Sequence, residues 1–196
     1  HAAKSNFKRM EAQLRKELEE NLDSSLATGF VIDKFKIVKE IGRGGMSSVY
    51  LAKRADGLFD QQVAIKLLSP DLLGEKHQSY FDTERKILAR LNHPNISKIL
   101  DGGMIAGVPY LIMEYVEGSS LETYLKENDL LVKDKIALFK RICEAVRYAH
   151  GRLILHRDLK PSNINIDQHG AVKLLDFGFS GFIDEEGTRK REGGSL

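Results

Sequence analysis

The chain has 196 residues, of which 42% are hydrophobic and 30% are charged, and its formal net charge at pH 7 is +2. This length allows one domain or two small lobes with a sizeable core, and the composition is ordinary for a globular protein. The balanced charge gives no support to nucleic-acid binding, and no apolar run approaches the roughly 20 residues that span a bilayer.

Residues 4 to about 26 are predicted to form an amphipathic helix that ends near Gly29. Lys, Arg and Glu separate apolar residues spaced by three and four positions, namely Phe7, Met10, Leu14, Leu18, Leu22 and Leu26. Such a helix packs on its own domain or mediates self-association or partner binding, whereas its many Glu residues disfavour a membrane surface. We assign residues 1–30 to this extension, and because the chain begins with His1 rather than Met, we expect the natural N-terminus elsewhere.

The pattern changes to that of β-strands from residue 35 onward. Gly-containing turns separate three expected strands, which are Phe35–Ile41, Ser48–Lys53 and Gln62–Leu68. A helix is expected from about Glu75 to Leu91, and two further strands are expected at Ile99–Gly102 and Pro109–Val116. The strand-rich part then gives way to helical sequence, so we place a lobe boundary near Glu117-Gly118.

The second part of the chain is predicted to be mostly helical. Ser119-Ser120-Leu121-Glu122 has the form of a capping box, in which a Ser and a Glu three residues later satisfy each other's backbone N–H groups, and it opens a short helix. A longer helix is expected over Val132–Gly151, with an apolar side formed by Ile136, Phe139, Cys143, Val146 and His150. Short strands are expected around Asn163–Ile166 and Ala171–Leu175.

Cys143 is the only cysteine and therefore cannot form an internal disulfide. We expect it to be a buried structural thiol, because it lies on the apolar side of its helix. A single free thiol suits a reducing compartment, so we expect a cytoplasmic location.

The segment Gly42–Val49 joins two predicted strands and contains Gly42, Gly44 and Gly45. Glycines allow the backbone to approach phosphate groups closely and to donate N–H groups to them. It is not a dinucleotide-binding fingerprint, since no helix follows it, and it is not a Walker loop, since no Lys-Ser/Thr pair follows. By itself, this hairpin is better explained as an ordinary turn.

Lys66 ends the otherwise apolar strand Val63–Lys66, where a lone lysine is most often a solvated terminus. Glu84 changes that interpretation, because it falls within the apolar face of its helix, three residues after Phe81. An inward carboxylate is costly unless it meets a cation. We therefore expect a Lys66–Glu84 ion pair that orients the lysine toward phosphate oxygens.

Three oxygen-bearing side chains follow closely in the sequence. Asp158 and Asn163 lie five positions apart in one loop, and Asp176 follows the apolar strand Val172–Leu175. Such a set can orient a hydroxyl nucleophile through Asp158 and hold Mg²⁺ against a triphosphate through Asn163 and Asp176. Lys160 can neutralise charge on a transferring phosphoryl group. The arrangement therefore favours phosphoryl transfer.

These motifs follow one another in the order Gly-rich loop, Val63-Ala64-Ile65-Lys66, Glu84, His156-Arg157-Asp158 with Asn163, and Asp176-Phe177-Gly178. The chain therefore resembles a eukaryotic-type protein kinase. Its Lys160 is similar to that of Ser/Thr kinases, and the Gly-Gly-Met form of its Gly-rich loop resembles the bacterial members. The resemblance implies an α+β, bilobal fold. Its N-lobe (31–117) would be a small antiparallel sheet with one major helix, and its helical C-lobe (118–196) would be present only in part.

The resemblance also implies ligands and residue roles. The cofactors would be ATP and Mg²⁺, and the partner would be a protein substrate with a Ser or Thr hydroxyl. The catalytic residues would be Asp158, Lys160, Lys66 and Glu84, and the metal ligands Asn163 and Asp176. The nucleotide would be bound by Gly42, Gly44, Gly45, Val49, Ala64, Lys66, the gatekeeper Met113, the hinge residues Glu114 and Val116, and Asn165. A hydrophobic column linking the lobes would consist of Leu88, Ile99, His156 and Phe177. Candidate phosphorylation sites are Thr188 and Ser195.

Three departures from the family pattern stand out. Ser47 replaces the third glycine of the loop, which is tolerable because the first two glycines carry the tight turn and the phosphate approach. Asn165 replaces an apolar residue beneath adenine, so we expect weaker nucleotide affinity or an altered pose of the nucleotide. The chain also ends at Leu196, before the end of the activation segment. We therefore expect a truncated domain, with a disordered tail over 184–196 and an apolar face of the Val132–Gly151 helix left partly uncovered.

The sequence favours an ATP-dependent protein Ser/Thr kinase, here as a truncated domain that is either active or inactive. The alternative is a non-catalytic nucleotide-binding or scaffold module, but pseudokinases usually lose residues equivalent to Lys66, Asp158 or Asp176, and none is lost here. A small-molecule phosphotransferase is disfavoured by the complete set of motifs. Self-association would use the N-terminal helix or the uncovered C-lobe face.

Overall fold

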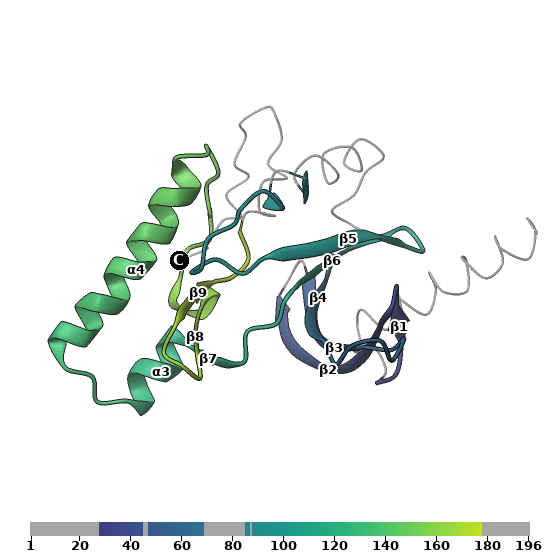
Figure 1. The fold of residues 1–196 in the computed structure, drawn as a ribbon, viewed down its shortest axis with the longest axis horizontal. Coiled ribbons are helices and arrows are strands. Elements are labelled where there is room, and N and C mark those ends of the chain that lie inside the picture. Colours follow the sequence, from purple (N-terminus) through teal and green to yellow (C-terminus); the bar gives the residue numbers. More distant parts are fainter. Residues whose placement is uncertain (1–27, 45–46, 69–84, 87, 178–196) are drawn as a thin grey trace, which may run out of the picture.

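Strands rich in apolar residues build a six-stranded sheet in the first half of the chain, and buried and exposed positions alternate most clearly along Phe35–Gly44. The computed structural model describes residues 28–44, 47–68, 85–86 and 88–177. The sheet is antiparallel throughout, with the strand order β1-β2-β3-β4-β6-β5 (Figure 1). Its strands are β1 Val31–Ile32, β2 Phe35–Gly44, β3 Ser47–Arg54, β4 Gln62–Leu68, β5 Ile99–Ile105 and β6 Val108–Glu114.

The core of this sheet consists of apolar side chains on one of its faces. Its fully buried members include Ile37, Tyr50, Ala52, Val63, Ile65 and Ile112. The observed strands confirm those predicted from the sequence, with two extensions. β2 continues through the Gly-rich segment, because Gly42 pairs with Val49 and Gly44 with Ser47. β5 continues to Ile105, where a tight turn at Gly107, with φ 81°, leads into β6.

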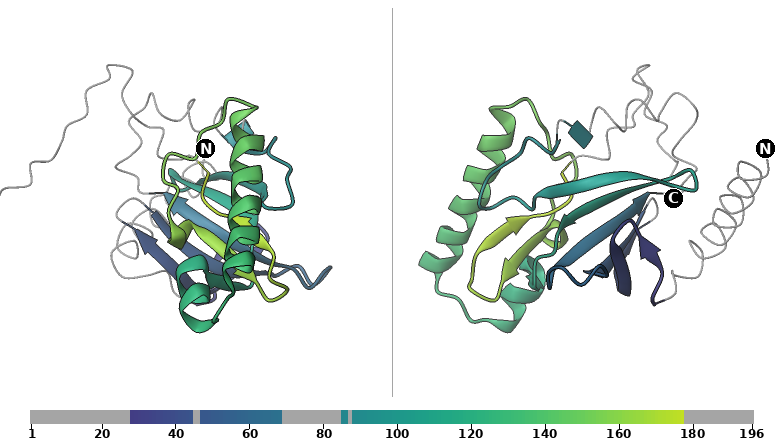
Figure 2. Two further views of the ribbon diagram at one scale, coloured as in Figure 1. Left: turned by 90° about the vertical axis from the view of Figure 1, so that its left-hand side faces the viewer. Right: turned by 45° about the vertical axis from the view of Figure 1, so that its right-hand side comes forward.

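A second, three-stranded antiparallel sheet consists of β7 Gly118–Ser120, β8 Ile164–Asp167 and β9 Val172–Leu174. It lies between the helices of the second half and the six-stranded sheet (Figures 1 and 2). The sequence analysis missed β7, as it missed β1. At the start of β7, a Cβ on Gly118 would lie 2.1 Å from the carbonyl oxygen of Ile166, so only glycine fits this approach of two backbones.

Two α-helices and a short 3-10 turn complete the described second half: α3 Leu121–Glu127, α4 Val132–His150 and η2 Pro161–Asn163. Our capping-box prediction was wrong in its residues. Ser120, not Ser119, caps α3, and its side chain accepts a hydrogen bond from the backbone N–H of Thr123. Glu122 instead pairs with Lys126, 2.7 Å away and one turn along the helix.

The buried face of α4 differs from the predicted one. Ile142, Ala145 and Ala149 face the core, whereas Ile136 and Phe139 are 51% and 64% exposed. Cys143, predicted to be buried, is exposed, as is His150, and only Val146 of the predicted side packs partly against the core. The helix carries apolar residues on two faces, so periodicity alone selects the wrong one. The exposed stripe agrees with the expectation of a partly uncovered apolar face.

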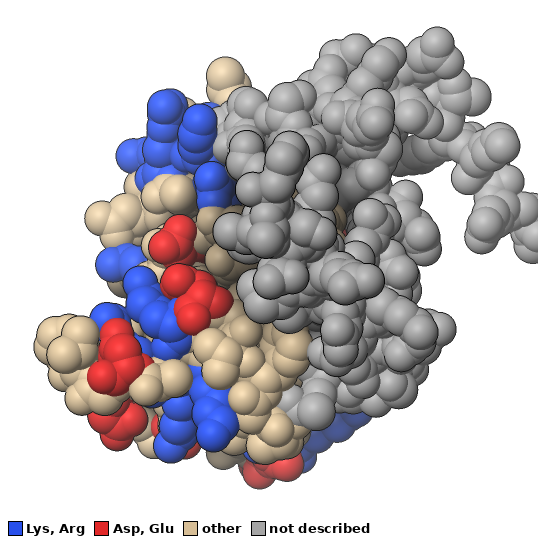
Figure 3. All heavy atoms as spheres, turned by 90° about the vertical axis from the view of Figure 1, so that its right-hand side faces the viewer, with Lys and Arg blue, Asp and Glu red and all other residues tan. Residues whose placement is uncertain are grey.

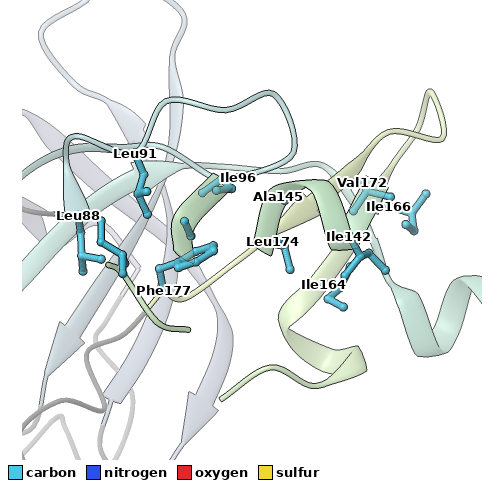
Figure 4. Packing of buried hydrophobic residues seen from close by; sticks show 12 residues of the cluster. Leu88, Leu91, Ile96, Ile142, Ala145, Ile164, Ile166, Val172, Leu174 and Phe177 are labelled. Carbon is cyan, nitrogen blue, oxygen red and sulfur yellow. The ribbon is translucent and has the colours of Figure 1, made fainter. Parts of the chain in front are cut away.

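The core of the second half joins α4 to the small sheet and to residues before β5. Figure 4 shows Ile142 and Ala145 of α4 on the same cluster as Leu174, Ile164 and Val172 of the sheet, with Leu88, Leu91 and Phe177 at its other end. The predicted hydrophobic column lies here. Leu88 and Phe177 are buried in this cluster, and Ile99 packs against it. The centroid of the His156 ring lies 4.7 Å from the centroid of the Phe177 ring.

Several predictions fall outside the described residues: the helix over residues 4–26, Gly45, Glu84, the tail over 184–196 with Thr188 and Ser195, and most of the helix expected over residues 75–91. Residues 85, 86 and 88 of that last helix are helical. Within the described part of the chain, no helix is both long and apolar enough to span a membrane. On the face shown in Figure 3, acidic and basic side chains of the described residues are intermixed.

Candidate active site

A cleft of about 1000 Å³ collects residues from both sheets and from the connection between them. Every predicted site residue that the structure describes lines it. These residues are Gly42, Gly44, Val49, Ala64, Lys66, Met113, Glu114, Val116, Asp158, Lys160, Asn163, Asn165 and Asp176. Gly45 and Glu84 lie outside the described residues. The sequence thus predicted a set of residues that share one cavity.

Strand register explains why the N-lobe residues face the same cavity. Val49 of β3 pairs directly with Lys66 of β4, and Ala64 lies two positions before Lys66 on the same side of the strand. Met113 of β6 pairs in turn with Ala64. The Gly-rich hairpin is braced at its base by the side chain of Arg43, whose Nε and Nη2 donate to the carboxylate of Glu40 at 2.9 and 2.7 Å.

Lys66 forms an ion pair with Asp176 in the cleft, with its Nζ 2.9 Å from Oδ1. Both side chains are mostly buried, at 12% and 28% exposure. Asp176 adopts a left-handed backbone conformation, with φ 54°, which a non-glycine residue rarely takes and which is enriched at functional sites. The expected Lys66–Glu84 pair stays a prediction, since Glu84 is not among the described residues.

Asp158 is the acceptor at the centre of a second polar cluster. Asn163 Nδ2 donates to its backbone oxygen at 2.8 Å and to its Oδ2 at 2.9 Å, and Lys160 Nζ lies 2.8 Å from the same Oδ2. These bonds, that of Lys160 first, lower the pKa of the Asp158 carboxyl below its ordinary value, against a smaller opposing effect of desolvation. Asp158 is therefore ionised at neutral pH and can accept a proton or orient a hydroxyl.

Backbone contacts bring Asn163 and Asp176 to the same end of the cleft. The N–H of Leu175 donates to the carbonyl of Asn163 at 2.8 Å, which joins η2 to the residue just before Asp176. His156 Nε2 lies 2.7 Å from the carbonyl oxygen of Leu175 and so contacts the other backbone polar group of the same residue. The positions of both predicted metal ligands are thus fixed by the chain around Leu175.

The donor chemistry of this end fits Mg²⁺. The amide nitrogen of Asn163 donates to Asp158, which leaves Oδ1 as its acceptor, and Asp176 adds carboxylate oxygens. The described residues contain no group of three or more His, Cys, Asp or Glu side chains that could hold a metal ion. Mg²⁺ is usually bound by one or two carboxylates together with phosphate oxygens and waters, so a sparse oxygen set of this kind suits it.

The connection between the lobes begins where β6 ends. The N–H of Glu114 donates to the carbonyl of Lys98, and its carbonyl accepts from Ser97 Oγ at 3.2 Å. Asn165 Nδ2 lies 3.4 Å from the carbonyl of Val116, a long hydrogen bond. The Asn165 side chain therefore extends from β8 to the hinge, at the position where we expected an amide that stacks poorly on adenine.

Two residues that the sequence analysis did not single out also belong to the surroundings of the site. Ser97 lines the cleft, and Lys173 forms an ion pair with Glu114, with Nζ 2.7 Å from Oε1. Lys173 could have been noticed, because it is a charged residue within an otherwise apolar strand. Its partner lies 59 positions earlier in the chain, a separation that no local pattern reports.

Comparisons with known proteins agree with this geometry. Residues 35–196 match the protein kinase domain family. Over 155 residues, the chain is 39% identical to the probable serine/threonine-protein kinase PknB of Lactococcus lactis, covering 78% of this chain and 25% of that protein. It is 40% identical over 149 residues to the serine/threonine-protein kinase PrkC of Bacillus subtilis, covering 75% and 23%.

The fold is also that of a solved bacterial kinase domain. The crystal structure of the PknI kinase domain of Mycobacterium tuberculosis superposes with a TM-score of 0.66 at 30% identity, covering 78% of this chain and 63% of that one. The chain thus spans about a quarter of the length of the curated relatives it matches and under two thirds of that solved domain. The family match over most of its length shows that the chain belongs to the protein kinase domain family.

Proposed function

We propose that the protein is an ATP-dependent serine/threonine protein kinase, which transfers the γ-phosphoryl group of Mg·ATP to a protein hydroxyl. One observation carries the proposal: the cleft between the two sheets is lined by all the described residues that phosphoryl transfer requires. The names of the relatives PknB and PrkC support the choice of serine and threonine as acceptors.

Each polar residue has a distinct proposed role. Lys66, which pairs with Asp176, would bind phosphate oxygens of the nucleotide, while Asn163 and Asp176 would hold Mg²⁺, which would neutralise charge on the phosphates. Asp158 accepts or orients the proton of the substrate hydroxyl. Lys160, which contacts the Asp158 carboxylate, offers its ammonium charge to the transferring group. Glu84 is proposed as a further partner of Lys66.

The apolar and backbone groups of the cleft are proposed to hold the base and the phosphates. Val49 and Ala64 share one face of the N-lobe sheet and would cover the adenine ring, with Met113 behind it. Glu114 and Val116 would offer backbone groups to its edge, above Asn165. Gly42, Gly44 and Gly45 would approach the phosphates.

We also propose the division of the chain and its surroundings. The N-terminal extension would cover residues 1–30, the N-lobe residues 31–117 and the partial C-lobe residues 118–196. This division is supported by the separate sheets, since β6 ends at Glu114 and β7 begins at Gly118. The single free cysteine supports a reducing, cytoplasmic environment.

The test is transfer of labelled γ-phosphate to a generic basic protein, comparing the parent chain with Asp158→Asn and Lys66→Met. We expect transfer by the parent and a loss of at least about a hundredfold in each variant, because each removes a group that acts in the transition state. Equal transfer by the parent and Asp158→Asn would contradict the proposal. Binding of Mg·ATP without any transfer would instead favour the non-catalytic module.

A further inference from the structure

Lys173 lies in β9 between two fully buried residues, Val172 and Leu174, so its side chain projects from the opposite face of the strand. There it meets Glu114, the last residue of β6, at 2.7 Å. The two side chains are 15% and 31% exposed. The ion pair thus joins the strand that leads to Asp176 with the start of the connection between the lobes.

Glu114 is held by several groups at once. Its second carboxylate oxygen, Oε2, accepts the backbone N–H of Lys98 at 3.2 Å, while its own N–H donates to the carbonyl of Lys98 at 2.8 Å. Ser97 Oγ donates to its carbonyl oxygen. Of these contacts, the one with Lys173 is an ion pair. It involves Oε1 of Glu114, the carboxylate oxygen that does not accept from Lys98.

The backbone between the two partners forms a bridge of its own. The N–H of Ser97 donates to the carbonyl of Leu174 at 2.9 Å, and the N–H of Leu174 donates to the carbonyl of Asn95 at 2.8 Å. Residues 95–98 therefore lie between β9 and Glu114 and bond to both. Through its ion pair with Glu114, the Lys173 side chain forms a second link between the same two elements, β9 and the end of β6.

We propose that Lys173 is a positioning residue for the nucleotide site. By holding the Glu114 carboxylate, it fixes the hinge residues 114–116 relative to β9, in the orientation in which they meet adenine. Among the described residues, Glu114 and Val116 line the cleft and Lys173 does not, so Lys173 acts through Glu114. The inference rests on the proposed function, since it requires that a nucleotide binds at this hinge.

The consequence of losing the ammonium group follows from the surroundings of Glu114. Its half-buried carboxylate would keep the N–H of Lys98 but lose its counter-charge, and it would be drawn toward water. The hinge would then sample orientations that bind adenine less well. Because only the displacement of the hinge, and not the whole cost of breaking the pair, is felt by the ligand, affinity should fall by up to about fivefold, which corresponds to about 1 kcal/mol.

Calorimetric titration of the full chain with two ligands tests this assignment. Adenosine reports on the hinge alone, whereas Mg·ADP also engages Asp176. For Lys173→Met we expect both dissociation constants to rise by the same factor, about three- to fivefold, and for Lys173→Arg we expect values close to those of the parent. Asp176→Asn is the matched control, and it should weaken Mg·ADP while leaving adenosine unchanged.

Two results would overturn the assignment: parent-like affinities in Lys173→Met, or a loss confined to Mg·ADP, which would place the effect at the metal end. If Lys173→Met does not fold, as judged by circular dichroism, Glu114→Gln removes the same ion pair with a smaller change. In Glu114→Gln the dissociation constants of adenosine and Mg·ADP must rise by the same factor. Parent-like dissociation constants in this variant would refute the role of the Lys173–Glu114 ion pair. A parent chain that binds neither ligand refutes the proposed function itself, before any variant is compared.

Discussion

At the scale of single residues, Asp158 and Lys160 show how one contact sets a protonation state. The Lys160 ammonium group is the largest cause of the lowered pKa of the Asp158 carboxyl, followed among the favourable ones by the amide of Asn163. Asp158 is half exposed, so solvent screens the pair and its effect on stability is small. In the proposed function, the pair keeps the Asp158 carboxylate charged beside a substrate hydroxyl.

Replacing Lys160 should move this titration in a definite direction. In Lys160→Met the pKa of Asp158 should rise toward its ordinary value, because the charged form loses its main partner. A carboxyl whose pKa is lowered on folding stabilises the fold above its unfolded pKa and loses this contribution as the pH falls through the folded pKa. The variant should therefore be slightly less stable than the parent at neutral pH and equal to it in acid.

Carbon-13 NMR of labelled aspartate and glutamate carboxyls across pH 2 to 6 measures this shift. Lys126→Met is a matched control, since Lys126 forms an equivalent pair with Glu122 in α3, far in sequence from Asp158. It should raise the pKa of Glu122, which this pair lowers, and leave Asp158 as it is. An unchanged Asp158 titration in Lys160→Met would show that the pair does not control it.

The residues of the site were predictable where their chemistry is local. Asp158, Lys160 and Asn163 lie in one short loop, so their spacing in the sequence already places them together. Lys66 was predicted as a cleft lysine, and it is one, although its described partner is Asp176. The Lys173–Glu114 pair was not predictable, because it depends on how β9 packs beside the end of β6.

At the scale of elements, α4 carries two apolar stripes with different surroundings. One packs on the small sheet through Ile142, Ala145 and Ala149, and the other leaves Val132, Ile136 and Phe139 between 51% and 72% exposed. Exposed apolar residues gathered on one helix face mark a surface prone to association.

Two substitutions one turn apart on α4 should therefore have opposite signatures. Ile142→Ala should lower the free energy of unfolding by about 2–5 kcal/mol, because it leaves a cavity in the core. Phe139→Gln should change it by less than about 0.5 kcal/mol and should reduce the binding of a hydrophobic dye. Urea denaturation and dye fluorescence measure the two effects. Equal destabilisation by both would mean that Phe139 is covered in solution.

Strands were more predictable than the helix face for a physical reason. Alternation in β2 reports directly on which side meets the core, whereas β4 is a short apolar run buried on both faces, and β2, β3 and β4 were all confirmed. The short strands β1 and β7 were missed because two or three residues carry no period. β7 exists because Gly118 lets the chain approach β8, which is a tertiary condition.

At the scale of the whole molecule, the two sheets provide opposite walls of one cleft. A ligand that contacts both walls binds the folded chain and not the unfolded one, so it should raise the melting temperature. At a hundredfold excess over its dissociation constant, Mg·ATP should contribute about 2.7 kcal/mol, equivalent to roughly 5–10 °C for a chain of this size.

Differential scanning fluorimetry with and without a chelator isolates the contribution of the metal. Removing Mg²⁺ should reduce the shift produced by ATP in the parent chain. In Asp176→Asn the shift should be small and the same under both conditions, because a carboxylate ligand is lost. A metal-dependent shift that survives in Asp176→Asn would exclude this residue as the ligand.

The two-lobe plan was predictable from the order of strand-rich and helix-rich sequence, while the contacts that join the lobes were not. Asn95, before β5, donates through its side chain to the carbonyl of Val172 at 2.8 Å, across 77 positions of sequence. Such contacts depend on the assembled fold, in which each local element is already in place.

The backbone bridge at residues 95–98 has a mechanical consequence. Because it bonds to β9 on one side and to Glu114 on the other, it restrains the two sheets relative to each other at this point. In any rotation of one sheet against the other, the displacement of an atom grows with its distance from the restrained point. β2 and β3 are separated from β6 by β4 in the sheet, so they would be displaced farther than Glu114. We therefore expect the cleft to widen on the side of β2 and β3 when a ligand enters or leaves, while the bonds around Glu114 stay intact.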